Sequence, residues 1–356
     1  MGEEESALLW EQMDLDVITG DFERLFPTFS FDGKAVLTDI LRGQIWEALK
    51  KIGNGIMDAV LFQKGEYRTL FLTILILGVT AALFAGFADL FQDRQVSDLA
   101  FYFIYLLLIA VLLKFFADTA GTVREILESV TTFIKLYIPT YILAVGSASG
   151  TASASAYYQL LLVAVYLIEW GFLQILLPVV QGYVLLTVIN GVWMEEKLAL
   201  LLDLLEKVIG GSVKASLWLV TGFSLLQSMI SPVIDSLQSH TVKKALSALP
   251  GVGDLTEGMF EMVLGSAVLV RNSLGLYLTL LLLVLCAVPV IKIALTACVI
   301  KLSAALIGII SDKRLTNCVS RVGEGNLMLL KLTLTCVGMF LIQVAVISYS
   351  TGQFAH

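Results

Sequence analysis

Long stretches without a charged residue are the feature that most constrains this chain. Five runs of 20 to 25 residues contain no Asp, Glu, Lys or Arg: 69–88, 170–194, 215–234, 272–291 and 332–355. A helix rises about 1.5 Å per residue, so each run is long enough to cross a hydrocarbon core about 30 Å thick. Since 58% of the residues are hydrophobic and only 15% are charged, the chain is predicted to be an all-α polytopic membrane protein.

Two further apolar stretches set the expected number of helices. The run 99–113 becomes a span when its apolar flanks are added, whereas 136–168, with 33 residues, is too long for one helix. A segment of small residues, from Gly146 through Gly150 to Ala156, supplies a break. We expect about seven to nine membrane helices, together with short amphipathic interfacial helices. The range arises from two segments, 157–194 and 272–311. Each of them is either one broken helix or two separate membrane spans.

The amino-terminal segment differs from the rest of the chain in charge. Residues 1–68 contain 13 acidic and 7 basic side chains, a net charge of −6 out of −7 for the whole chain. Apolar residues from Val36 to Ile52 recur at helical spacing, which predicts an amphipathic helix on the membrane or on the protein's own transmembrane body. A small soluble helical cap is the alternative. We assign 1–68 to an acidic extracytoplasmic or interfacial helical segment and 69–117 to two leading transmembrane helices.

Composition argues against most kinds of chemistry. Two histidines and four cysteines, the latter spaced 12, 20 and 18 residues apart, do not form a conventional zinc, haem or iron–sulfur ligand set. No nucleophile elbow, HExxH or phosphate-binding loop is present. The fragment Gly251-Val-Gly-Asp254 is better explained as a helix N-cap than as part of an intramembrane aspartyl protease. We therefore expect no enzymatic activity, no metal or other cofactor and no nucleic-acid partner.

The second and third parts of the chain share an order of features. Leu177-Pro-Val-Val180 matches Val288-Pro-Val-Ile291, and Lys214-x-Ser-Leu217 matches Lys331-x-Thr-Leu334. Matching features lie 111 to 119 residues apart, which predicts an internal repeat; chance similarity between leucine-rich spans is the alternative. Duplication is typical of transporters and channels, which place broken helices around a pathway between the copies. Inverted and parallel arrangements both stay open. The predicted copies, each about 115 residues long, are 118–235 and 236–356.

Polar side chains within apolar segments mark the candidate site. A charge at the middle of the bilayer costs at least about 3 kcal/mol unless it faces protein or water. Lys301 lies about midway along 290–311, and Lys292 precedes it by nine residues. Glu169, alone between two apolar runs, is the expected acidic partner, and Gln181 aligns with Lys292 in the repeat. These four residues either line a polar pathway between the copies or form purely structural contacts between helices.

Helix breaks are predicted where proline or small residues interrupt the apolar segments. Proline removes an amide donor and clashes with the preceding turn. Small residues allow close helix approach or an irregular cavity lining. The predicted breaks are Pro139, Pro178, Pro250, Pro289, Gly146, Gly150 and Gly265.

The order of these features resembles one known family. The segments that show the resemblance best are Leu249-Pro-Gly-Val-Gly253, 265–275, 287–293 and 300–306, and weaker matches extend into the first half of the chain. They are similar to the stage III sporulation protein AE family of endospore-forming Firmicutes. Members of that family begin with a cleavable signal peptide, and the first 60 residues here contain no such pattern, so we expect a mature form.

The resemblance implies a place in a larger assembly. The expected partners are the lipid bilayer, the other stage III sporulation A proteins including a secretion-type ATPase, the forespore Q protein and a second copy of the chain. The expected location is the mother-cell membrane around the forespore, with the amino-terminal segment in the intermembrane space. Two functions are compatible with it: a channel or permease-like subunit, or a non-conducting scaffold that anchors the assembly's rings and ATPase.

Overall fold

The structure, a computed structural model, describes five stretches of backbone and single residues between 39 and 57. All five stretches are helices or the turns between them, and no strand occurs among these residues. The predicted all-α class is confirmed for this part of the chain. The five stretches are 64–91, 94–149, 163–192, 198–246 and 286–352. Side chains are described within them over 65–84, 102–132, 163–191, 198–222 and 286–342.

Six long helices make up these stretches, and the third contains a π-helical turn. Helix 163–192 comprises residues 163–171, the π-helical segment η1 (Phe172–Leu176) and α8 (Leu177–Val192). The helix Cys286–Ile307 is called helix 286–307 below. The remaining four are α5 (Lys64–Phe91), α6 (Arg94–Ser149), α9 (Ala199–Leu246) and α11 (Lys313–Gly352).

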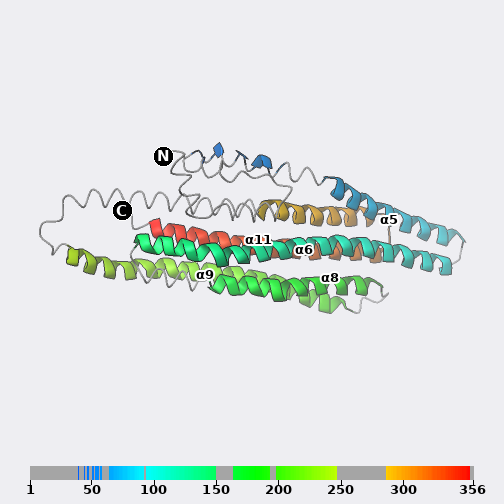
Figure 1. Ribbon diagram of the computed structural model, residues 1–356. Coiled ribbons are helices and arrows are strands. Elements are labelled where there is room, and N and C mark those ends of the chain that lie inside the picture. Colours follow the sequence, from blue (N-terminus) through cyan, green and yellow to red (C-terminus); the bar gives the residue numbers. More distant parts are fainter. Residues whose placement is uncertain are drawn as a thin grey trace.

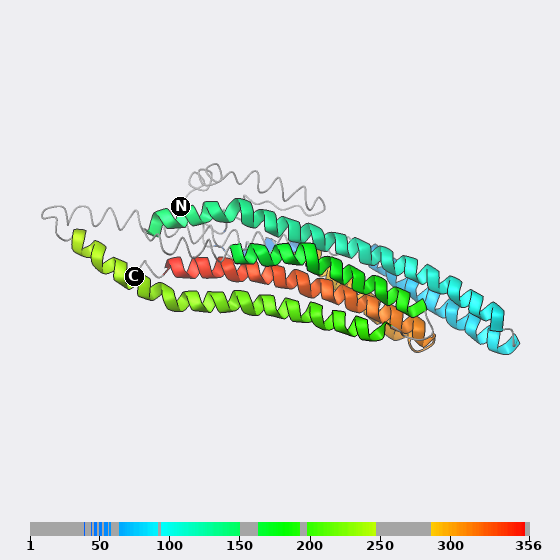
Figure 2. The same cartoon turned by 90° about the horizontal axis from the view of Figure 1, so that it is seen from below.

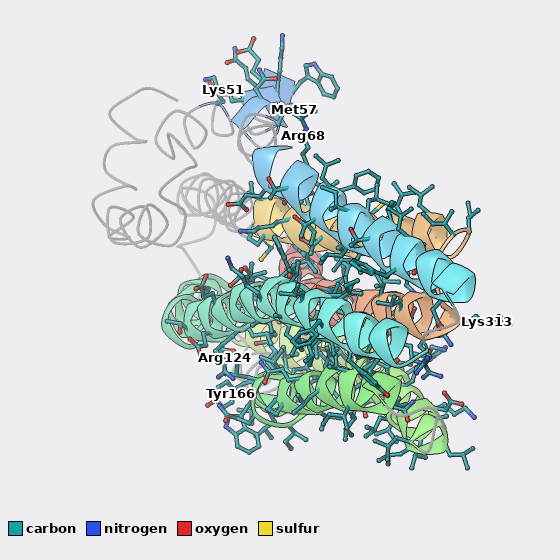
Figure 3. All side chains as sticks on the ribbon, turned by 90° about the vertical axis from the view of Figure 1, so that its right-hand side faces the viewer. Lys51, Met57, Arg68, Arg124, Tyr166 and Lys313 are labelled. Carbon is teal, nitrogen blue, oxygen red and sulfur yellow. The ribbon has the colours of Figure 1, made fainter. Side chains whose placement is uncertain are left out.

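The described helices form three hairpins that turn at the same end of an elongated bundle (Figures 1 and 2). The pairs are α5 with α6, helix 163–192 with α9, and helix 286–307 with α11. We call the shared end the turn end. α11 lies in the middle of the bundle, because it packs against α6, α8 and α9. Figure 3 looks along the bundle from the turn end and shows side chains filling the spaces between helices, with Lys313 at the edge.

Local hydrogen bonds fix two of the turns. Asp312 precedes α11, and its Oδ1 accepts a hydrogen bond from the backbone N–H of Arg314 at 2.7 Å. This bond satisfies one of the free N–H groups at the helix start, as an N-cap does. The side-chain oxygen of Asn190, near the end of helix 163–192, accepts a bond from the N–H of Leu198 at 2.9 Å. The second hairpin is therefore closed by a side chain of its first helix.

Five helical segments in the described part of the chain are long and apolar enough to span a membrane. Large apolar side chains point outward on several of them, including Leu106 and Ile175, both 58% exposed, as expected of surfaces that face lipid. The membrane class is thus supported, while the number of seven to nine spans stays a prediction. The five segments are Gly65–Phe84, Tyr102–Thr132, Val163–Gly191, Cys286–Ile307 and Lys313–Ile342.

Four of the predicted breaks do not interrupt their helices. α6 continues through Pro139 and Gly146 and ends at Ser149, and helix 286–307 includes Pro289. Helix 163–192 continues through Pro178 because η1 precedes it, with the N–H of Leu177 bonded to the carbonyl of Phe172. This wider turn makes room for a proline ring that lacks a donor. Transmembrane helices tolerate proline and glycine when local adjustments of this kind satisfy the backbone.

The other three predicted breaks, Gly150, Pro250 and Gly265, lie outside the described residues.

The segments that match in the predicted repeat run in the same direction. Helix 163–192 and helix 286–307 both end at the turn end, and α9 and α11 both begin there. For these segments the arrangement is that of a parallel pair. The duplication itself and the proposed domain boundaries stay predictions, and α6 runs without interruption across the boundary proposed after residue 117.

Candidate functional site

Lys301 is paired with an acidic residue that the sequence did not single out. Its Nζ lies 2.8 Å from Oε2 of Glu324 and 3.5 Å from the hydroxyl of Ser320. Lys331 approaches the other oxygen of Glu324, with its Nζ 3.9 Å from Oε1. Lys301, Ser320, Glu324 and Lys331 are called the Lys301 cluster. The cluster joins helix 286–307 to α11.

The backbone of α11 is shaped to receive Lys301. Ser320, Gly323 and Glu324 lie three and four residues apart, so they share one face of the helix. A Cβ at Gly323 would lie 3.1 to 3.3 Å from three carbons of the Lys301 side chain, which is closer than ordinary contact. Glycine therefore lets the lysine stem lie flat on α11 while its ammonium group reaches Glu324.

The Lys301 cluster lies close to the turn end of the bundle. Helix 286–307 ends six residues after Lys301, which is about 9 Å along the axis. Lys301 is midway along the segment 290–311, but that segment is not a single helix, because the helix stops at Ile307 and is followed by the turn at 308–312. The side chains of Lys301 and Glu324 are 33% and 24% exposed, so the pair is not sealed within the bundle.

A second ion pair joins α11 to α9. Nη1 of Arg321 lies 3.5 Å from Oδ1 of Asp203. The Asp203 side chain is 54% exposed, and exposed pairs of this kind contribute at most about 1 kcal/mol. Together the two ion pairs connect three helices at one level of the bundle.

Glu169 does not pair with Lys301, which corrects the sequence-based expectation. Its side chain is completely buried, and its Oε1 lies 3.5 Å from the thiol sulfur of Cys336 on α11. The other carboxyl oxygen, Oε2, is buried without a hydrogen-bond partner. The reason is register: Lys301 faces residues 320–324 of α11, whereas Glu169 faces Cys336, at least 12 residues or about 18 Å farther along α11.

The remaining two predicted site residues are half-buried. Lys292 lies on helix 286–307 and Gln181 on α8. Neither side chain takes part in the hydrogen bonds or ion pairs found among the described residues. The structure thus brings Lys301 into a polar cluster and leaves Glu169, Lys292 and Gln181 apart from it.

Three more buried polar groups lie where α8 meets α11, and sequence reasoning missed them. Within the described residues, the hydroxyl of Thr187 and the Oδ1 of Asn326 are buried without a hydrogen-bond partner, and the buried hydroxyl of Tyr183 lies close to the guanidinium of Arg321. Tyr183 and Thr187 are four residues apart on α8. The side chain of Val184, next to Tyr183, packs so closely on Gly325, next to Asn326, that a Cβ at Gly325 would overlap it. Tyr183 is also within electrostatic range of Arg321 and Glu324. These groups extend the polar region from the Lys301 cluster into the contact between α8 and α11.

The sequence contains only weak indications that Glu324 and these three buried polar residues belong to the site. Glu324 belongs to a charged segment that followed an apolar run in the predicted repeat, and such a segment is typical of an amphipathic surface. Tyr183, Thr187 and Asn326 are common polar residues in apolar helices. Only the packing of the helices shows that they are buried and close to one another.

Comparison with known proteins identifies the family. The family model for stage III sporulation protein AE matches residues 31–351. The chain belongs to the stage III sporulation protein AE family. It is 21% identical over 276 residues to the stage III sporulation protein AE of Bacillus subtilis (strain 168), a match that covers 77% of this chain and 69% of that protein. No solved structure matches the chain.

The match confirms the family that the sequence motifs predicted. It gives the chain a sporulation context, and the apolar helices give it a membrane setting.

Proposed function

We propose that this chain is a channel or permease-like membrane subunit of the assembly that joins mother cell and forespore. In this proposal it lies in the mother-cell membrane with its amino-terminal segment in the intermembrane space. It works with the other stage III sporulation A proteins, including a secretion-type ATPase, and with the forespore Q protein. The observation that supports a conducting role is the Lys301 cluster between helix 286–307 and α11.

The cost of burying charge is the physical argument. Ionised groups at the middle of a membrane face protein or water, since a lipid-facing position there costs at least about 3 kcal/mol, and the cost falls toward the membrane surface. Lys301 and Glu324 keep a quarter to a third of their side chains exposed while lying between helices. The hydroxyl of Thr187, which has no hydrogen-bond partner among the described residues, adds to this polar surface, and buried polar groups of this kind are usually satisfied by water. A wet opening at the turn end accounts for both observations.

A non-conducting scaffold is the second candidate, and a specific observation favours it. The pairs Lys301–Glu324 and Arg321–Asp203 cross-link three helices, which is what a rigid anchor for other subunits requires. The two functions differ in what the ion pair does: in a conduit it faces solvent, and in a scaffold it only holds helices together.

Solute flux separates the two proposals. Lys301→Met in the full chain, reconstituted in liposomes with an entrapped small dye, is expected to reduce flux at least tenfold while capture of partner subunits stays intact. Lys313→Met is the matched control, because Lys313 is an exposed lysine at the start of α11 outside the cluster. Unchanged flux together with lost capture would favour the scaffold.

Water access provides a second, independent readout. In a background without native cysteines, Ser320→Cys places a thiol within the Lys301 cluster, and Leu106→Cys places one on an outward apolar face. A membrane-impermeant thiol reagent should label the first site and not the second. Protection at Ser320→Cys would contradict a wet opening.

A further inference from the structure

Glu169 is the single strongly ionisable residue of a long apolar region. Between residues 136 and 194 it is the only Asp, Glu, Lys or Arg. Its side chain is 0% exposed, and its Oε2 has no hydrogen-bond partner among the described residues. A buried polar atom without a partner is rare enough in folded proteins to need an explanation.

Among the described residues, the groups that face Glu169 carry no positive charge. Cys336 on α11 lies 3.5 Å from Oε1, and Cys286 on helix 286–307 is close enough to interact electrostatically with the carboxyl group. Both thiols are buried, at 0% and 2% exposure. On its own helix, Val165 and Leu173 lie one turn to either side and are buried apolar residues. Glu169 forms no ion pair with a Lys or Arg of the described stretches.

An ionised carboxylate in this position is costly. Burying an unpaired charge is strongly unfavourable, and a thiol supplies only a weak hydrogen bond. A metal ion would need more ligands, and no group of three His, Cys, Asp or Glu side chains suited to a metal occurs in the described part of the chain. A proton bound to the carboxyl group removes the charge without requiring any further ligand.

The helix next to Glu169 contains two features at which helices commonly bend. The π-helical segment η1 starts three residues after it, and Pro178 follows η1 by two residues. π-helical turns are frequent at functional sites, and together with proline they account for most bends within helices. A small bend here would separate the carboxyl group from Cys336 without breaking helix 163–192.

We propose that Glu169 is an intramembrane proton-binding site at the junction of helix 163–192, helix 286–307 and α11. In the packed arrangement the carboxyl oxygen forms an O–H bond with a proton taken from water. When the helix bends at η1 and the carboxyl group becomes hydrated, that O–H bond breaks and the proton returns to water. No electron is transferred. The inference rests on the proposed transport function and deepens it, because it names the proton as the ion that couples to helix movement.

Infrared spectroscopy tests the bound proton directly. The full chain in lipid nanodiscs at pH 7 should show the carbonyl stretching band of a protonated carboxylic acid, and Glu169→Gln should lack it. Glu324→Gln is the matched control, since Glu324 is ion-paired with Lys301 and its replacement should leave the band unchanged. A wild-type spectrum without the band, or a band that survives in Glu169→Gln, would overturn the proposal.

Stability against pH supplies a measurement that does not depend on the band. Above the ordinary Glu pKa of about 4.3, and as long as the folded protein keeps the proton, unfolding releases that proton and becomes about tenfold more favourable per pH unit as pH rises. Wild type should therefore lose stability with rising pH relative to Glu169→Gln. The same pH dependence in both proteins would count against a bound proton.

The outcome for the proton site is separable from that for the conduit. A band lost in Glu169→Gln together with unchanged flux in Lys301→Met would retain the proton site and reject the conduit. A flux defect in Lys301→Met with no band in wild type would support the conduit and reject the proton site.

Discussion

Helices α9 and α11 share a sequence pattern and a starting end but differ greatly in burial. α11 packs against α6, α8 and α9, whereas the main contacts of α9 are with α8 and α11. Trp218 on α9 is 78% exposed, and Thr335, which lies 117 residues later on α11, is 6% exposed. A side chain added at Gly211 of α9 would meet nothing within 4 Å, while Met328, again 117 residues later, is 3% exposed.

The difference teaches that an apolar stripe in a membrane helix does not reveal what covers it. In water, an apolar stripe predicts a protein contact. In a bilayer, lipid tails are as apolar as leucine, so association depends on close packing and polar contacts between helices. α11 has both, through its glycines and the Lys301 cluster. The comparison therefore predicts that equivalent changes act differently on the two helices.

The largest difference is expected for leucines. Leu332 on α11 is 0% exposed, and Leu204 on α9 is 57% exposed. Leu332→Ala should lower the free energy of unfolding by about 2–5 kcal/mol, because it leaves a cavity in the packed interior. Leu204→Ala should change it by about 0.5 kcal/mol or less. Denaturant titration of the purified protein in detergent measures both, and equal losses would contradict the difference in burial.

Glycines should give the next largest effect. A Cβ at Gly325 would overlap the Val184 side chain and approach Phe116, so Gly325→Ala should destabilise the protein by about 1–3 kcal/mol through overpacking. Gly211→Ala meets open space and should stabilise α9 by up to about 1 kcal/mol, because alanine favours the helix. Thermal unfolding of the two variants should therefore shift in opposite directions. Shifts of the same sign would show that α9 is packed as tightly as α11.

The two ion pairs should differ less in their contribution to the free energy of unfolding. Glu324→Gln removes a partner 2.8 Å from Lys301, and Asp203→Asn removes one 3.5 Å from Arg321 with greater exposure. We expect losses of about 1 kcal/mol and about 0.3 kcal/mol in the free energy of unfolding. A double-mutant cycle of Glu324→Gln with Lys301→Met isolates the coupling. A coupling energy of zero would show that the pair does not hold the helices together.

The smallest effect is expected at Trp218. Because its side chain is largely exposed, Trp218→Leu should leave the free energy of unfolding within about 0.5 kcal/mol of wild type. The same measurement on Phe340→Leu, at a completely buried position of α11, is the matched comparison. A large loss at Trp218 would indicate that another molecule covers α9 in the membrane.

Sequence reasoning predicted the helical class and placed apolar segments where the described helices occur. It also selected Lys301 and Glu169, because isolated charges in apolar runs are visible without a structure. It paired them wrongly, since the level at which two helices meet depends on turn positions and register. The N-cap at Asp312 and the contact of Lys301 with Gly323 set that register.

Four of the predicted breaks do not end a helix, and the reason is related. Proline in an apolar segment predicts a kink or a tight reversal, but a transmembrane helix that is supported by neighbours accommodates the missing donor and continues. At Pro178 the adjustment is η1, and no composition signal distinguishes such a turn from a regular one. Glu324 was missed because its importance comes only from the lysines on either side of it in space.

The length of α6 has a mechanical consequence. With 56 residues the helix is about 84 Å long, nearly three times the thickness of the hydrocarbon core. A helix of this length cannot lie upright within the hydrocarbon core, so α6 is either strongly tilted or projects beyond the membrane surface.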